Sequence, residues 1–236
     1  MHTPGSRLTG ARRYDPPWWD HQRHPLVGLR RGITALLDHA SVARRGGRVV
    51  DLGCGDRPYE LLIRGRGFEY IGCDLDDHGD VLIVPGAPVP LPTGSASGVL
   101  SCQVLEHVWD LDWYLGECHR LLEPGGWLLL STHGTWPYHP HPSDYRRWTR
   151  DGLASELQTR GFRLATINGV IGPLAWTTQI RALGFRQVLM TISPLRLLVP
   201  PIMMAMNLRM RLEDAMTPRS IVEVNACIYV TLCVRE

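Results

Sequence analysis

The fold is decided by residues 48–75, which read RVVDLGCGDRPYELLIRGRGFEYIGCDL. RVVDLG (48–53) is an apolar run of the length of a buried strand, and FEYIGCDL (68–75) is a second one. PYELLIRGR (58–66), between them, is typical of a short helix. A strand, a helix and another strand in this order predict a βαβ unit with parallel strands.

The first strand runs directly into Gly53-Cys54-Gly55, which places bare backbone where a ligand can approach closely. A dinucleotide site would have a third glycine at position 58, which is proline here. Asp74 ends the second strand, 23 positions after Asp51, where a carboxylate accepts both ribose hydroxyls of an adenosine. This spacing favours a nucleoside ligand, and a tight turn without a ligand is the alternative.

The rest of the chain continues the alternation of strands and helices. Apolar runs predict further strands at 81–85, 96–103, 126–132, 162–169 and 224–234. Helical spacing predicts helices at 24–43, from about Glu106 to Leu122, and at 150–160. The pattern predicts an α/β fold with a doubly wound, mostly parallel sheet, whose ligand crevice lies beyond the carboxyl ends of the strands.

We expect one domain over residues 1–236, because 236 residues bury a sizeable core without disulfide or metal. Its predicted parts are an N-terminal arm and helix (1–45), a cofactor-binding core (46–170), a helical lid (171–220) and the final strand (221–236). The lid is rich in Leu and Met and has helical spacing. We interpret it as a lid or a homodimer face, with an acceptor pocket for a hydrophobic substrate or a membrane-surface patch rimmed by arginine as the alternatives.

Composition excludes several classes of protein. A net charge of +2 and the absence of long basic runs predict no nucleic-acid partner. The six cysteines stand singly, and the N-terminus lacks the apolar segment of a secretory signal, so we expect a cytoplasmic protein. The longest apolar stretch, 197–206, is broken by two prolines and predicts no transmembrane segment.

Four segments carry a family resemblance: VVDLGCG (49–55), YIGCDL (70–75), GVLSCQVLEHV (98–108) and LLEPGGWLLLST (121–132). In sequence and spacing they resemble the class I S-adenosylmethionine-dependent methyltransferases, especially the small single-domain group with the V-L-E-H-V signature. The resemblance covers about residues 48–165. It implies a Rossmann-like sheet of seven strands, with the last strand antiparallel and beside the sixth.

The resemblance also implies how the cofactor is held. Asp51 would lie near the ammonium of the methionine part, Asp74 would hold the ribose, and Leu75 would pack on the adenine. The residues implied to contact the cofactor are Asp51, Gly53, Cys54, Gly55, Asp74, Leu75, Ala87 and Gln103. The chain departs from the family at two positions: Arg57 stands where a third glycine is frequent, and Ala87 where an aspartate often meets the adenine.

Methyl transfer needs an acceptor held in line with the methyl group, and a base where the acceptor carries a proton. Histidine has the pKa for that base. We therefore expect His107, His133 and His139 to act on the acceptor, with His133 or His139 as the first choice of base. Structural roles are the alternative for each histidine, and Asp144 with Arg146 would form an ion pair that fixes the loop.

A divalent metal is an alternative to the base rather than the first expectation. Gln103, Glu106 and His107 would share a helical face, and with His133 they resemble the E-x-x-E-H cluster of small-RNA 2′-O-methyltransferases and some quinone-pathway O-methyltransferases. Gln103 departs from that cluster, and two imidazoles suit Zn²⁺, Mn²⁺ or Fe²⁺ better than Mg²⁺. As the opening of a helix, Glu106 and His107 would otherwise be N-terminal capping residues.

Together these patterns predict an S-adenosylmethionine-dependent methyltransferase acting on a small molecule. The acceptor we expect is a hydroxyl of a natural-product or sugar intermediate. The alternatives are N-methylation of a small amine, a non-catalytic scaffold that retains the fold, and an RNA methyltransferase, which the charge balance disfavours.

Overall fold

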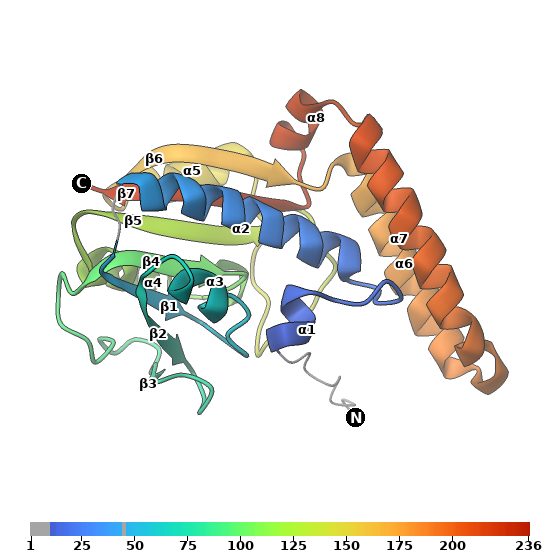
Figure 1. Ribbon diagram of the computed structural model, residues 1–236, viewed down its shortest axis with the longest axis horizontal. Helices are drawn as coiled ribbons and strands as arrows, with labels where there is room; N and C mark the ends of the chain where they lie inside the picture. The colour runs from blue at the N-terminus through green and yellow to red at the C-terminus, as the bar shows by residue number, and fades with distance from the viewer. Residues whose placement is uncertain (1–9, 44–45) are drawn as a thin grey trace.

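A single seven-stranded sheet forms the centre of the computed structural model, which describes residues 10–43 and 46–236 (Figure 1). The strand order is β3-β2-β1-β4-β5-β7-β6. Neighbours from β3 to β5 pair in parallel, whereas β7 is antiparallel to both β5 and β6. The predicted doubly wound sheet with an antiparallel last strand is thus confirmed. The strands are β1 (Arg48–Leu52), β2 (Glu69–Asp74), β3 (Val81–Leu82), β4 (Ala96–Cys102), β5 (Leu122–His133), β6 (Phe162–Val170) and β7 (Ile228–Arg235).

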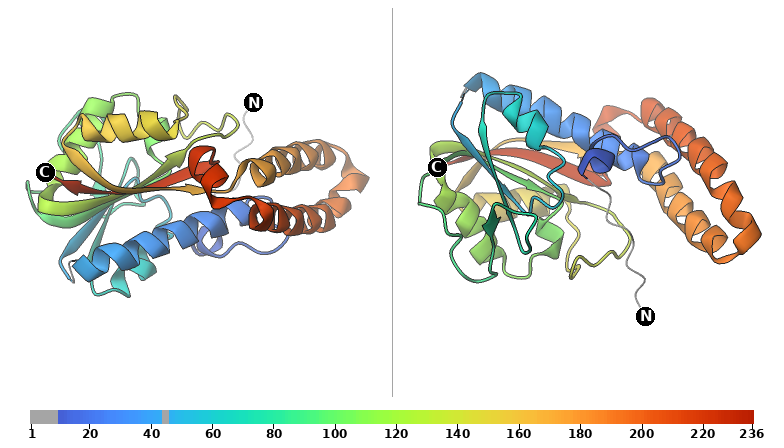
Figure 2. Two further views of the ribbon diagram at one scale, coloured as in Figure 1. Left: turned by 90° about the horizontal axis from the view of Figure 1, so that it is seen from above. Right: turned by 60° about the horizontal axis from the view of Figure 1, so that its bottom comes forward.

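Helices cover both faces of this sheet, with α2 and α3 on one face and α4 and α5 on the other (Figure 2). They are α1 (Gly10–Tyr14), α2 (Arg23–Ala43), α3 (Glu60–Arg64), α4 (Leu111–Leu121), α5 (Arg150–Gln158), α6 (Pro173–Thr191), α7 (Val199–Met216) and α8 (Arg219–Val224), with 3-10 turns η1 (Leu105–His107) and η2 (Ser193–Leu198). Helix α1 was not predicted. Residues 1–9 and 44–45 of the predicted arm lie outside the described residues.

Two apolar cores, one on each face, hold the helices to the sheet. Because side chains alternate along a strand, Val49 of β1 packs toward α2 and its neighbour Val50 packs toward α4. Strand β4 is buried over six of its seven residues, as expected for a central parallel strand covered on both sides. This double coverage is why the strands read as continuous apolar runs.

The predicted helix from Glu106 to Leu122 is wrong at its start. Glu106 and His107 lie in the short turn η1, and α4 begins only at Leu111. The reason is a side-chain cap, because the Asp110 carboxylate accepts a hydrogen bond from the Trp113 amide at 3.0 Å. The capping role expected of Glu106 and His107 therefore belongs to Asp110.

The segment predicted as a lid is helical and forms an antiparallel hairpin of α6 and α7, joined by η2 (Figure 1). The hairpin projects past the end of the sheet in every view (Figures 1 and 2). Helix α8 then leads back to the sheet, so that β7 begins at Ile228 rather than at the predicted residue 224.

Gly98 offers a test of this packing. It pairs with Trp127 on the neighbouring strand, and a Cβ at Gly98 would overlap the Trp127 indole ring. We expect Gly98→Ala to lower the free energy of unfolding by about 1–3 kcal/mol, the usual cost of overpacking. Gly116→Ala on α4 is the control, because a Cβ there meets nothing within 4 Å. Urea denaturation measures both, and equal stability of the two variants would contradict the packing.

Candidate functional site

The predicted site residues come together at one edge of the sheet. Strands β1, β4 and β5 are neighbours and parallel, so their carboxyl ends lie side by side. Asp51 lies near the end of β1, Gln103 directly follows β4, and His133 is the last residue of β5. The structure thus places the predicted cofactor residues beside the predicted acceptor residues.

The turn after β1 has the backbone that the glycines predicted. Gly53 and Gly55 have φ values of 81° and 50°, in the left-handed region that favours glycine. Arg57 has a φ of 52° as well, in the same left-handed region that favours glycine. Its guanidinium donates hydrogen bonds to the His78 carbonyl at 2.7 Å and to the Asp80 carboxylate at 2.8 Å, which holds this non-glycine residue in place.

Asp74 fastens this turn to the end of β2. One of its oxygens accepts the Gly55 amide at 2.5 Å and the other accepts the Leu75 amide at 2.7 Å. A carboxylate oxygen has a second lone pair, so Asp74 still has acceptor capacity for two hydroxyl groups. The Leu75 side chain is 50% exposed and presents apolar surface next to it.

Asp51 is a buried carboxyl group with one unused oxygen. Its Oδ2 accepts a hydrogen bond from the Tyr70 hydroxyl at 2.8 Å, while its Oδ1 is buried without a hydrogen-bond partner. Burial raises the pKa of Asp51 to about 7. A positively charged donor at Oδ1 would satisfy the orphaned oxygen, so Asp51 fits a ligand ammonium.

Cys54, Ala87 and Gln103 are the remaining residues predicted to contact the cofactor. Cys54 is buried within the turn after β1, and Ala87 is half-buried, with its carbonyl accepting the Trp113 indole N–H at 2.8 Å. Gln103 has a φ of 58° and donates from Nε2 to the Ser131 hydroxyl at 3.1 Å, while its Oε1 is a second buried acceptor without a partner. Two unsatisfied acceptors at neighbouring strand ends fit a polar ligand with donors.

The three predicted histidines form one cluster from three different segments. His107 comes from η1, His133 from the end of β5 and His139 from the following loop. The ring centre of His139 lies 4.9 Å from that of His133 and 5.0 Å from that of His107. The cluster therefore exists in the fold although the sequence separates its members by 32 residues.

His133 is the most buried of the three and is held between two groups. Its ring stacks on Trp136 at 4.9 Å, and its Nε2 lies 3.4 Å from Glu106 Oε1. Burial lowers the pKa of His133 well below its usual value and raises the pKa of Glu106 to about 7. Glu106 also accepts a hydrogen bond from Thr132 at 2.8 Å, so this acid is positioned by β5.

His107 and His139 both have one nitrogen fixed by a carbonyl. His107 Nδ1 lies 2.5 Å from the Ser143 carbonyl oxygen and His139 Nδ1 lies 3.2 Å from that of Pro137. A carbonyl only accepts, so Nδ1 of His107 carries the proton and its Nε2 keeps the lone pair, whereas Nδ1 of His139 also lies 3.4 Å from the Arg147 guanidinium, which only donates. Burial lowers the pKa of His107, and lowers that of His139 to about 4, so both rings are neutral at pH 7.

The loop that carries His139 is fixed by an ion pair other than the predicted one. Asp144 binds Arg147 through two hydrogen bonds of 2.6 and 2.7 Å and accepts the His139 amide at 2.9 Å. Arg147 holds the pKa of Asp144 well below its usual value. Arg146, the predicted partner, instead donates to the backbone carbonyls of Val108 and Trp109.

Three donors in the cluster also have the arrangement of metal ligands. One ligand atom each of Glu106, His133 and His139 lies within 4.8 Å of the others. The predicted common helical face of Gln103, Glu106 and His107 does not exist, because Gln103 has left-handed backbone and turns toward Ser131. His139 stands in the donor set in place of Gln103 and His107.

Sequence reasoning missed residues that shape this cluster. Trp136 and Arg147 lie in the loop after β5, and Arg147 donates to the carbonyls of Trp136 and Pro137. Arg13 of α1 lies close to Gly55 in the turn after β1. The many aromatic and charged residues of this loop could have indicated Trp136 and Arg147, whereas no local sequence pattern indicated Arg13.

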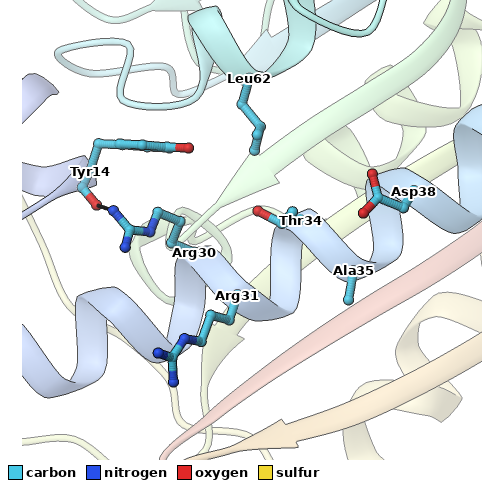
Figure 3. Close-up of a pocket in the computed structure, with 7 residues that line it drawn as sticks. All are labelled: Tyr14, Arg30, Arg31, Thr34, Ala35, Asp38 and Leu62. Atoms are coloured by element: carbon cyan, nitrogen blue, oxygen red, sulfur yellow. Dashed lines mark hydrogen bonds between the residues drawn. The ribbon is translucent and has the colours of Figure 1, made fainter.

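A separate hollow lies between α1, α2 and α3 (Figure 3). It is bounded at one end by Arg30, which donates to the Tyr14 carbonyl at 2.7 Å, and at the other by Asp38, which pairs with Arg66. No predicted site residue lines it, and we assign it no role. Its lining residues are Tyr14, Arg30, Arg31, Thr34, Ala35, Asp38 and Leu62.

The sheet order and the strand-end turn define a Rossmann-like methyltransferase class, and comparison with known proteins agrees. A family model for a methyltransferase domain matches residues 19–186. A "Probable S-adenosylmethionine-dependent methyltransferase" of Mycolicibacterium smegmatis is 31% identical over 189 residues, which cover 69% of this chain and 68% of that protein. The chain belongs to the methyltransferase-domain family and is an S-adenosylmethionine-dependent methyltransferase.

The chain is also similar to a quinone-pathway enzyme and to a solved structure of the same fold. A ubiquinone biosynthesis O-methyltransferase of Bordetella avium is 26% identical over 133 residues, which cover 49% of this chain and 55% of that protein. The solved structure of the [4+2]-cyclase SpnF has a TM-score of 0.57 at 16% identity, over 86% of this chain and 79% of that one. The second likeness shows the fold alone.

The raised pKa of Asp51 predicts a pH-dependent stability of the cofactor-free protein. The folded chain keeps this proton up to a pKa of about 7, whereas an unfolded aspartate loses it near pH 4. Unfolding thus releases a proton between these values, and stability falls as pH rises, by up to about 1.4 kcal/mol per pH unit. Asp51→Asn keeps the acceptor for Tyr70 and removes this contribution.

Urea denaturation of the wild type and of Asp51→Asn between pH 4 and 8 checks this expectation. Asp77→Asn is the control, because the Asp77 side chain is fully exposed. Parallel pH profiles for the wild type and Asp51→Asn would contradict a proton on the buried carboxyl group.

Proposed function

We propose that this enzyme O-methylates a hydroxyl group of a small molecule, a natural-product or sugar intermediate, in the cytoplasm. The observation that carries the proposal is the cluster of His107, His133 and His139 at the sheet edge where the cofactor turn lies. Neutral imidazoles are proton acceptors, and a hydroxyl acceptor must lose its proton during the transfer. The O-methyltransferase among the relatives supports the same choice.

In this proposal the residues at the carboxyl ends of β1, β2 and β4 would hold S-adenosylmethionine, which would supply an electrophilic methyl group. Asp51 Oδ1 would receive the ammonium, Asp74 would receive the ribose hydroxyls, and Leu75 would pack on the adenine. Gly53, Cys54 and Gly55 would allow a close approach to the backbone, while Ala87 and Gln103 would complete the site. The orphaned oxygens of Asp51 and Gln103 support this placement.

The proton of the acceptor hydroxyl goes to an imidazole nitrogen that keeps its lone pair. His139 Nε2 fits this role, because Nδ1 of the same ring is directed to the Pro137 carbonyl and lies 3.4 Å from Asp144. Asp144 then stabilises the imidazolium that forms. His133, stacked on Trp136 and next to Glu106, is the alternative acceptor of this one proton.

A second form of this function uses a divalent ion in place of a free base. The convergence of Glu106, His133 and His139 favours it, because two imidazoles and a carboxylate suit Zn²⁺, Mn²⁺ or Fe²⁺. Glu106 Oε1 is buried without a hydrogen-bond partner, which a cation would satisfy. These residues would hold the ion, which would lower the pKa of a bound acceptor hydroxyl.

Substitution of the histidines tests the base. We expect His133→Asn and His139→Asn, made separately, to lower kcat with a hydroxyl acceptor by about 100-fold or more, because general-base catalysis contributes about 10²–10⁴-fold. His39→Asn is the control on exposed α2 surface. Methyl transfer from labelled cofactor to a panel of hydroxyl and amine acceptors provides the rates, and unchanged rates in both variants would exclude a histidine base.

Metal titration separates the two forms. In the ion-assisted form, we expect chelator-treated protein to bind one Zn²⁺ or Mn²⁺ by calorimetry, and we expect Glu106→Gln to lose this binding. His107→Asn is the matched control, since His107 lies in the cluster but not in the donor set. Full transfer activity after chelation, without measurable ion binding, would leave the free base as the mechanism.

A further inference from the structure

The hairpin of α6 and α7 has a fixed base and a free end, residues 185–198, which we term the apex (Figures 1 and 2). At the base, Asn207 donates hydrogen bonds to the carbonyls of Trp18 and Asp20 at 2.9 and 2.8 Å. Gln179 donates to the His21 carbonyl at 2.8 Å. These bonds join both helices to the segment before α2, so the direction of the hairpin is set by the folded core.

The apex exposes an unusual amount of apolar side chain. Six large apolar residues there are between 41% and 82% exposed. A small core formed around Ala182, Val199 and Met203 packs the two helices together toward the apex, while Ala175 and Met210 belong to one of the two cores of the sheet. Exposed apolar side chains gathered at the end of a projecting hairpin are typical of an interaction site. The exposed residues are Phe185, Val188, Met190, Ile192, Leu197 and Leu198.

The charges of this region have one sign. The sequence contains no aspartate or glutamate between Glu156 and Glu213, and the charged residues of the apex are Arg186 and Arg196. Arg196 donates from Nε to the Met190 carbonyl at 2.9 Å, which holds its guanidinium at the apex. A surface that combines exposed apolar groups with arginine complements a layer of anionic headgroups above hydrocarbon.

We propose that the apex docks on an anionic lipid bilayer. Leu197 and Leu198 enter the boundary between headgroups and acyl chains, and Arg196 binds a lipid phosphate. Arg186, whose charge also acts on His21 at the base of the hairpin, adds positive charge behind it. Docking is interfacial, since no helix among the described residues is long and apolar enough to cross a membrane. The proposal does not depend on the choice of acceptor or base above.

A second copy of this chain is the competing occupant, and charge disfavours it. Two apices brought together would place Arg186 and Arg196 of both copies next to one another with no acidic residue of the apex between them. Within the apex, the exposed apolar residues come from the end of α6, from η2 and from the residue between them, whereas the exposed Met204, Leu208 and Leu212 of α7 lie outside it. A bilayer can cover the apex on several sides at once, whereas a helix of a second copy would cover only one side of it.

The orientation of the hairpin relates this surface to the site. Val170 at the end of β6 and His133 at the end of β5 both pair with Ile228, and α6 begins three residues after Val170. The hairpin therefore leaves the sheet at the edge where the histidine cluster lies. Docking through the apex brings this edge toward the lipid surface.

Flotation of the full-length protein with vesicles tests the proposal. We expect binding to vesicles of phosphatidylcholine with phosphatidylglycerol, weaker binding to phosphatidylcholine alone, and a decline with added salt. Leu197→Glu/Leu198→Glu should lower the affinity by at least about tenfold. Arg186→Gln/Arg196→Gln should lower it by roughly fivefold per arginine, as expected for basic residues near an anionic surface.

Matched controls separate the apex from surface hydrophobicity and charge in general. Leu61→Glu changes a leucine on α3 that is 85% exposed, compared with 82% for Leu197. Arg163→Gln/Arg219→Gln removes two exposed arginines outside the hairpin. Both controls should bind vesicles as the wild type does, and thermal midpoints should show that every variant is folded.

Three outcomes would overturn the proposal. The first is a wild type that does not float with anionic vesicles. The second is binding that the apex substitutions leave unchanged. The third, seen by light scattering, is a dimer that Leu197→Glu/Leu198→Glu converts to monomer without any vesicle binding, which would assign the apex to a second copy.

Discussion

The backbone of one residue, Cys227, connects the parts of the structure on which the site depends. Its carbonyl accepts hydrogen bonds from the amides of Gly134 and Thr135 at 2.9 and 3.1 Å, and its amide donates to the Ile171 carbonyl at 2.9 Å. The histidine loop after β5, the entry to the hairpin after β6 and the start of β7 thus meet at a single point. This contact exists only because β7 lies antiparallel between β5 and β6.

At the same sheet edge, burial sets the protonation of the acidic and basic groups in opposite directions. It raises the pKa values of Asp51 and Glu106 and lowers those of His133 and His139, because the charged form of each loses hydration. All four groups are therefore driven toward their neutral forms. Burying four ionisable groups without a charged ligand lowers the free energy of unfolding. A site that carries this cost is a reason to regard these residues as functional rather than structural.

The sequence predicted the features that depend on a local pattern of residues, but not those that depend on contacts between distant segments. Apolar runs located the strands, and family motifs added the place of the last strand, because a buried strand needs a continuous apolar run. The start of α4 was missed because a single carboxylate, Asp110, decides it. The partner of Asp144 was missed by one position, Arg147 in place of Arg146, since the direction of a loop side chain depends on contacts with β5 and η1.

The histidine cluster shows the same limit more sharply. The sequence indicated which histidines are candidates, but only the folded loop after β5 shows that His139 lies next to His133 and Glu106 while Gln103 turns away. The turn at Gln103 has left-handed backbone, so periodicity could not have predicted where its side chain lies. A sequence motif therefore predicts which side chains lie at the end of a strand. The conformation of the loop after β5 determines which of these side chains are close enough to act together.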